Sequence, residues 1–193
     1  MDNKLNNVQA VLTRFRDFVI SESKKNLNTG GQYGSHNNTS SLKNSIKGEI
    51  VSEGDYSIVA FKMNDYGYYQ DKGVKGKSSS AKAPNSPFRF GSGKSKGSGE
   101  GLTKSILKWV QAKRFQFRNK VNGKNTKKGT LMSYQQTAYL ISRSIFHKGI
   151  KPSLFFTKPF EAGYKKYIDT DLMKAFSQDV DTIVDYNLTN IKW

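Results

Sequence analysis

The chain has 193 residues, with 32 Lys and Arg against 15 Asp and Glu, which gives a net charge of +17 at pH 7. It has no cysteine, which excludes a disulfide, a thiol nucleophile and a thiolate metal site. The hydrophobic share is only 35%, but 12% of the residues are aromatic, so a modest core in one domain is expected. No apolar run could span a bilayer and the N-terminus lacks a signal-peptide segment, so we expect a protein that is made and kept in a cytoplasm-like compartment, or packaged from one.

The positive charge is concentrated between Lys72 and Lys128. This stretch has sixteen Lys or Arg and a single acid, Glu100, for a net charge of +15. The other residues have 16 basic and 14 acidic side chains, a net charge of only +2. Self-repulsion in such a segment weakens a compact state, so we expect acidic groups to approach it.

The first predicted element is an amphipathic helix at about residues 4–26. Its apolar residues at helical spacing are Val8, Val11, Leu12, Phe15 and Val19. Residues 30–40 are polar and glycine-rich, which predicts a loop.

A short helical turn at 40–46 and a β-hairpin are predicted next. The strands cover 47–52 and 56–63, separated by the turn-forming triplet Glu53-Gly54-Asp55. The tyrosine-rich segment 65–73 is then typical of a one- or two-turn helix that ends at Gly73.

Residues 74–100 consist mainly of Gly, Ser, Lys and Pro, and no secondary structure is predicted there. A helix at 102–114 follows, with Trp109 on its apolar face. A second basic loop at 118–129 separates it from a helix at 131–148, which Gly149 ends.

The C-terminal part is predicted to be extended at 151–157, because Pro152 disfavours helix before it. Pro159 opens a helix, and residues 169–171 (Asp-Thr-Asp) predict the N-cap of a last one. The apolar stripe predicted for that last helix is Leu172, Phe176, Val180 and Ile183.

The predicted fold class is α+β. An N-terminal helix and C-terminal helices pack on a small antiparallel sheet, in a single domain of residues 1–193. Residues 74–148 form a basic insertion, with flexible loops around a helical pair.

No residue pattern predicts an enzyme. The segment 91–95 (GSGKS) lacks the earlier glycine of a phosphate-binding loop, since Phe88 stands there, so a flexible basic loop is favoured. His36 and His147 have no organised ligand partners, so no zinc site is predicted. The scattered Asp residues leave a carboxylate enzyme open, but nothing predicts one. We therefore expect no catalytic, cofactor or metal site.

The basic segment has three interpretations: contact with a nucleic-acid backbone, docking onto acidic protein neighbours, or a solvated flexible loop. The segments 88–90 and 115–118 mix aromatic rings with Arg, as single-strand binders do. The candidate contact residues are Lys75, Lys77, Lys82, Arg89, Lys94, Lys96, Arg118, Lys120, Lys124, Lys127 and Lys128.

Three short segments and the order of elements carry a resemblance. They are Leu42–Ile46 before the hairpin, Tyr66–Gly73 after it, and the entry to the C-terminal helices from Pro152 to Ala162. They resemble the head–tail joining, or tail-completion, proteins of tailed double-stranded DNA phages. The helical pair at 106–110 and 138–145 is similar to versions in phages and prophages of gut Bacteroidetes, including crAss-like phages. The insertion at 74–148 distinguishes this chain from smaller members.

The resemblance implies a structural virion protein. Copies would form a homo-oligomeric ring in the neck, between the portal or its adaptor and the tail, assembled in the bacterial cytoplasm. Its partners would be itself, neighbouring portal, adaptor or tail proteins and the DNA in the lumen, with no membrane, cofactor or catalytic residue. A stand-alone basic nucleic-acid-binding protein is the alternative.

The residues that carry the family pattern are Tyr66, Tyr69, Gly73, Pro152, Phe155, Phe156 and Ala162. The aromatic residues Tyr66, Tyr68, Tyr69, Phe155, Phe156 and Phe160 are predicted to lie in the core or at an interface.

Overall fold

The computed structural model describes residues 5–29, 40–53, 56–92, 101–120 and 129–190. The chain divides into two compact units, which are described separately. The first unit comprises residues 1–71 and 153–193, and the second comprises residues 72–152. The predicted basic insertion at 74–148 therefore lies within the second unit.

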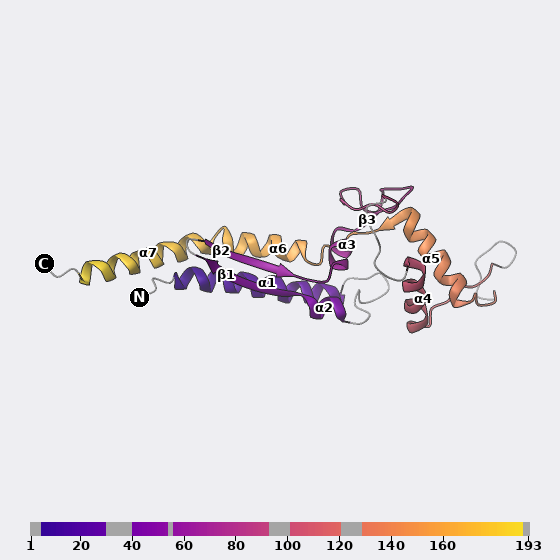
Figure 1. The fold of residues 1–193 in the computed structure, drawn as a ribbon, viewed down its shortest axis with the longest axis horizontal. Helices are drawn as coiled ribbons and strands as arrows, with labels where there is room; N and C mark the ends of the chain where they lie inside the picture. The colour runs from indigo at the N-terminus through magenta and orange to yellow at the C-terminus, as the bar shows by residue number, and fades with distance from the viewer. Residues whose placement is uncertain (1–4, 30–39, 54–55, 93–100, 121–128, 191–193) are drawn as a thin grey trace. The chain divides into compact units, whose positions relative to one another are not determined.

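The first unit packs helices on a β-hairpin, which confirms the predicted α+β class (Figure 1). The two strands pair antiparallel, with Lys47 opposite Lys62 and Glu53 opposite Tyr56. The longest helix of the unit, α1, packs against β1, α6, η1 and α7. The elements are α1 (Asn6–Thr29), α2 (Ser41–Ser45), β1 (Lys47–Glu53), β2 (Tyr56–Lys62), α3 (Tyr66–Lys72), α6 (Thr157–Gly163), the π-helical turn η1 (Tyr164–Ile168) and α7 (Asp171–Asn190).

The core of the first unit has an aliphatic and an aromatic part. Leu27, Leu42 and Ile46 are buried around Phe155. Beside them, the Phe61 ring from β2 lies 5.9 Å from Phe15 of α1, 5.4 Å from Phe156 and 6.0 Å from Phe160, all in edge-to-face geometry. This arrangement, favoured by ring quadrupoles, joins the hairpin to helices from both ends of the chain.

The chain leaves and re-enters the first unit at neighbouring positions. The amide N–H of Ser153 donates to the carbonyl of Gln70 at 3.0 Å, and that of Leu154 donates to the carbonyl of Asp71 at 3.0 Å. The second unit is therefore inserted between two chain segments that are hydrogen-bonded to each other.

The second unit is built on the helix pair α4 (Leu102–Ala112) and α5 (Tyr134–Lys148). Val110 of α4 and Ala138 of α5 are fully buried, and the hydroxyls of Thr103 and Ser142 lie 2.9 Å apart between the helices. Trp109 is only half-buried. Strands β3 (Val74–Lys75) and β4 (Gly149–Ile150) pair antiparallel.

Residues 74–92 are more regular than predicted. Besides pairing with β4, Lys75 exchanges backbone hydrogen bonds with Phe88 at 2.8 Å and Phe90 at 2.9 Å. The Phe90 ring lies 5.9 Å from Phe146 on α5, and the buried Ser86 hydroxyl donates to the Gly73 carbonyl at 2.7 Å. The prediction of a structureless loop is wrong here because a few apolar and hydroxyl side chains between the lysines provide anchors.

The boundaries at Gly73 and Gly149 are as predicted. Their φ angles are +70° and +83°, in the left-handed region that favours glycine. An added Cβ at Gly149 would lie 2.2 Å from the Val74 carbonyl oxygen, so the β3–β4 pairing also requires a residue without a side chain.

The C-terminal helices agree with one prediction and contradict another. α7 begins at Asp171, so its N-cap position lies within the predicted cluster 169–171, although Asp169 itself keeps a right-handed helical backbone (φ −70°, ψ −26°) at the end of η1. In α7, Phe176 and Val180 of the predicted buried stripe are exposed, whereas Ala175 and Asp179 are buried. α7 packs on α1, Ala175 is 5% exposed, and the Asp179 carboxylate accepts hydrogen bonds from the start of α1.

Candidate nucleic-acid or partner interface

The second unit carries more positive charge than the net charge of the whole chain. Residues 72–152 contain 19 Lys or Arg and one acid, Glu100, a net charge of +18. The first unit has 13 basic and 14 acidic residues, a net charge of −1. The three ion pairs between described residues, Arg16–Asp17, Lys25–Glu22 and Lys62–Glu49, all lie in the first unit. The separation of charge thus follows the separation into units.

One group of candidate cations lies around β3. Lys75 is half-buried, and Lys77 and Lys82 are exposed. The Lys77 ammonium lies 5.8 Å from the centre of the Phe146 ring, a cation–π contact that holds it on α5. The Arg89 guanidinium donates to the Gly76 carbonyl at 3.4 Å and to the Ser80 hydroxyl at 3.0 Å, so it stabilises this loop while remaining exposed.

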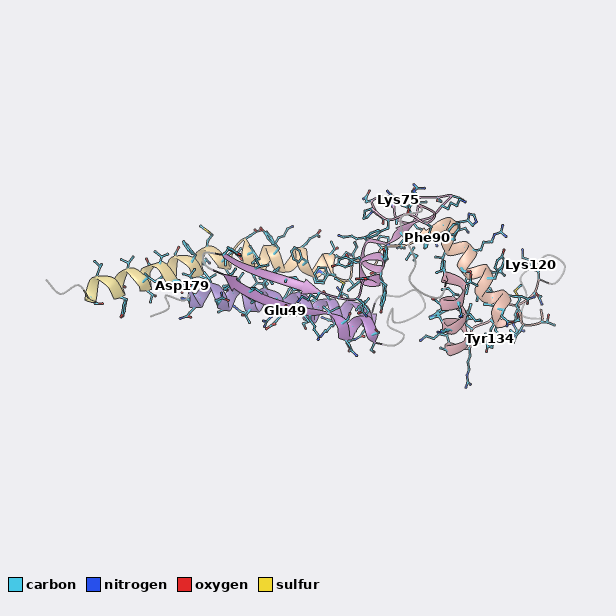
Figure 2. All side chains as sticks on the ribbon, in the orientation of Figure 1. Glu49, Lys75, Phe90, Lys120, Tyr134 and Asp179 are labelled. Atoms are coloured by element: carbon cyan, nitrogen blue, oxygen red, sulfur yellow. The ribbon has the colours of Figure 1, made fainter. Side chains whose placement is uncertain are left out.

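A second group lies at the other end of α5. Figure 2 shows Lys75 and Phe90 near one end of this helix and Lys120 near the other. Arg118 donates to the Gly129 carbonyl at 2.9 Å, which closes the basic loop, and Lys120 is exposed. The capping box of Ser133 and Gln136 fixes this end of α5, with hydrogen bonds of 3.1 Å in both directions. The Ser-x-x-Gln pattern of this capping box is a short-range signal in the sequence, although the helix was predicted to begin at 131.

Exposed aromatic rings accompany these cations. The rings of Phe115 and Phe117 lie 5.2 Å apart, and Trp109 lies 6.2 Å from Phe115. Both phenylalanines are exposed, and Arg114 and Arg118 stand next to them in the chain. Rings beside guanidinium groups are suited to stack on unpaired bases or to pack on a protein partner.

An open hollow of about 390 Å³ lies on α5. It is lined by Leu140, Arg143, Ser144, His147 and Lys148, which combine one apolar side chain with two cations. The Ser78 hydroxyl lies 2.9 Å from Nδ1 of His147, so this ring is engaged with the neighbouring loop. The hollow is suited to bind a partner surface that combines negative charge with an apolar side chain.

Several candidate residues lie outside the described part of the chain. They are Lys94, Lys96, Lys124, Lys127, Lys128 and His36. In the glycine-lysine segment 91–95, only residues 91 and 92 are described.

Two buried carboxylates have structural roles that the sequence did not indicate. Asp179 of α7 is 5% exposed and accepts hydrogen bonds from the amides of Asn7 at 3.0 Å and Val8 at 2.9 Å, and from the Asn7 side chain at 2.8 Å. Asp71 is 3% exposed and accepts from the amides of Phe156 at 2.8 Å and Thr157 at 3.1 Å, and from the Thr157 hydroxyl. Each carboxylate therefore satisfies the first amides of a distant helix, α1 or α6.

Among the described residues, the side chains with a shifted pKa belong to the first unit. The hydrogen bond from Lys62 lowers the pKa of the exposed Glu49 carboxyl on the hairpin. Partial burial raises the pKa of the Tyr66 phenol, although the residue is 46% exposed. Among the described residues, no three His, Asp or Glu lie close enough together to hold a metal ion. No helix in the described ranges is long and apolar enough to cross a membrane.

The family-pattern residues divide between core and surface. Phe155 is buried, Phe156 and Phe160 are half-buried, and Pro152 is half-buried at the end of the second unit. Ala162 is exposed on α6. Three tyrosines of α3 are exposed, which places them at the surface rather than in the core: Tyr66, Tyr68 and Tyr69.

No family model, curated protein or solved structure matches this chain.

Proposed function

We propose that this chain is a structural virion protein, a subunit of a homo-oligomeric ring in the neck of a tailed phage, between the portal region and the tail. The observation that carries the proposal is the division into a nearly neutral unit of charge −1 and a basic unit of charge +18. A subunit with two unlike surfaces is suited to head-to-tail association. Such an assembly closes into a ring when the rotation between neighbouring subunits adds up to a full turn.

The positions of the three family-like segments agree with this proposal. Leu42–Ile46 leads into the hairpin, Tyr66–Gly73 forms α3 and its glycine stop, and Pro152–Ala162 leads into α6. Exposed apolar residues on the hairpin, such as Tyr56 and Ile58, provide further surface for neighbouring subunits. The proposed partners are other copies, portal, adaptor or tail proteins, and the DNA in the lumen.

The test is the number of copies in solution and in particles. Sedimentation velocity and native mass spectrometry of the purified protein should show a closed oligomer or concentration-dependent association. Quantitative mass spectrometry of purified phage particles should find a fixed small multiple of copies per virion. A chain that remains monomeric at all concentrations, or is absent from particles, contradicts the proposal.

A second candidate function is that of a stand-alone nucleic-acid-binding protein. The exposed Phe115 and Phe117 rings beside Arg114 and Arg118 favour it. A binder of this type loses affinity steeply as salt rises, because each neutralised phosphate releases counterions. Fluorescence anisotropy with a single-stranded oligonucleotide at several salt concentrations distinguishes the two candidate functions. Tight, salt-dependent binding by a monomer supports the stand-alone nucleic-acid-binding protein.

A further inference from the structure

The solvent side of α7 is unexpectedly apolar. Five side chains, each between 37% and 70% exposed, recur every three or four residues and so share one side of the helix. We call these residues the α7 apolar face: Met173, Phe176, Val180, Val184 and Leu188. A continuous exposed stripe of this kind marks an interaction site more often than an ordinary solvated surface.

The second half of α7 extends beyond the helix that it packs on. Asp179 bonds to the first turn of α1 through Asn7 and Val8. The residues after Asp179 therefore continue past the N-terminal end of α1, as Figure 1 shows at the C-terminal end of the chain. Eleven more helical residues rise about 16 Å. In proteins, most helical stability comes from packing of an amphipathic face, so a packing partner would stabilise this second half of α7.

The charge beside the α7 apolar face restricts the choice of partner. Asp181 and Asp185 directly follow Val180 and Val184, lie one turn apart and are exposed. The whole helix has four Asp and one basic residue, Lys174. Pairing with a second α7 would bring like charges together, and a nucleic-acid backbone would be repelled. The partner must combine apolar surface with positive charge.

The basic unit provides such a surface on α5. Leu140 and Tyr139 are exposed there, and Arg143 and Lys148 line the hollow together with Leu140. We infer that α7 of one copy docks on α5 of a second copy, with the α7 apolar face on Leu140 and Tyr139 and the carboxylates of Asp181 and Asp185 facing Arg143 and Lys148. This inference rests on the proposed function and identifies the two unlike surfaces that a head-to-tail ring requires.

Charge reversal in the full-length protein tests the contact. Sedimentation velocity over a concentration series should show that Asp181→Lys/Asp185→Lys weakens self-association at least tenfold. Arg143→Glu/Lys148→Glu should do the same. An equimolar mixture of the two variants should associate again. The positively charged α7 of the first variant can dock on the negatively charged α5 of the second, and the unchanged α7 of the second can dock on the unchanged α5 of the first. The matched control is Glu22→Lys/Glu161→Lys, which changes the net charge equally but lies away from the α7 apolar face, and it should associate like the wild type.

The outcomes separate this inference from the proposed function. Restored association in the mixture supports the inference. If the wild type forms oligomers and the α7 variant forms them equally well, the α7 contact is wrong and the ring proposal stands. If the α7 variant lowers the melting temperature of the monomer without changing association, the face packs within its own chain and the inference is again wrong. If the wild type stays monomeric throughout, both proposals fail. Circular dichroism confirms that each variant is folded.

Discussion

The Asp179 carboxylate is expected to be one of the strongest polar contributions to the stability of the first unit. It accepts three hydrogen bonds from Asn7 and Val8, at 2.8 to 3.0 Å, and it is buried. Replacing an N-capping side chain by Ala costs about 0.5–2 kcal/mol. Here two amides lose a charged acceptor in a partly buried site, so we expect Asp179→Ala to cost about 2–3 kcal/mol. Asp179→Asn keeps one acceptor oxygen but loses the charge, and should cost about 1 kcal/mol.

Urea unfolding followed by circular dichroism measures this loss. Hydrogen exchange resolved by peptide should show faster exchange at the start of α1, because its first amides lose their acceptor. The control is Gln178→Ala, one residue before Asp179 on the same helix and exposed. Exposed substitutions of this kind usually change stability by less than about 0.5 kcal/mol. If Asp179→Ala and Gln178→Ala lower the free energy of unfolding equally, the Asp179 carboxylate does not stabilise the start of α1.

Three further predictions concern the two units and their connection. Asp71→Ala should destabilise the first unit by about 2–3 kcal/mol in urea unfolding, because the α6 amides and the Thr157 hydroxyl lose their acceptor; an unchanged midpoint contradicts this. Gly149→Ala should cost at least about 3 kcal/mol and abolish protection of the β3–β4 amides in hydrogen exchange, because a positive φ and a backbone clash act together. The contrasting variant is Gly101→Ser at the N-cap of α4, where no described atom lies within 4 Å of the added Cβ, and it should stabilise by roughly 0.3 kcal/mol. Equal melting temperatures for the two variants argue against the strained geometry at Gly149. Replacing residues 73–151 by a short glycine linker should leave a folded first unit with cooperative thermal unfolding, and a molten product without a thermal transition would show that the unit depends on the insertion.

Local features were predictable because their physical causes lie within a few residues. The apolar stripe of α1, the hairpin around Glu53 and the stops at Gly73 and Gly149 all follow from short-range spacing and backbone freedom. The α+β class followed from their order. The charge separation was also readable from the sequence, although the compact structure around β3 was not.

The remaining features depend on partners far along the chain. Asp179 bonds to residues 171 and 172 positions away, and Asp71 to residues 85 and 86 positions away, so neither spacing nor composition indicates them. The prediction of which side of α7 is buried was wrong for a related reason. Periodicity predicted the larger apolar residues Phe176 and Val180 as core, whereas Ala175 is the residue that is buried in the structure. The α7 apolar face became visible only when the buried side of the helix was known.

The adjacent entry and exit of the inserted unit have an evolutionary consequence. Because Ser153 and Leu154 bond to Gln70 and Asp71, the stretch between them begins and ends at nearly one point. Genetic recombination at such a point can replace the whole second unit without interrupting the fold of the first unit. Ancestry is therefore best traced for each module alone, since the two need not share a history.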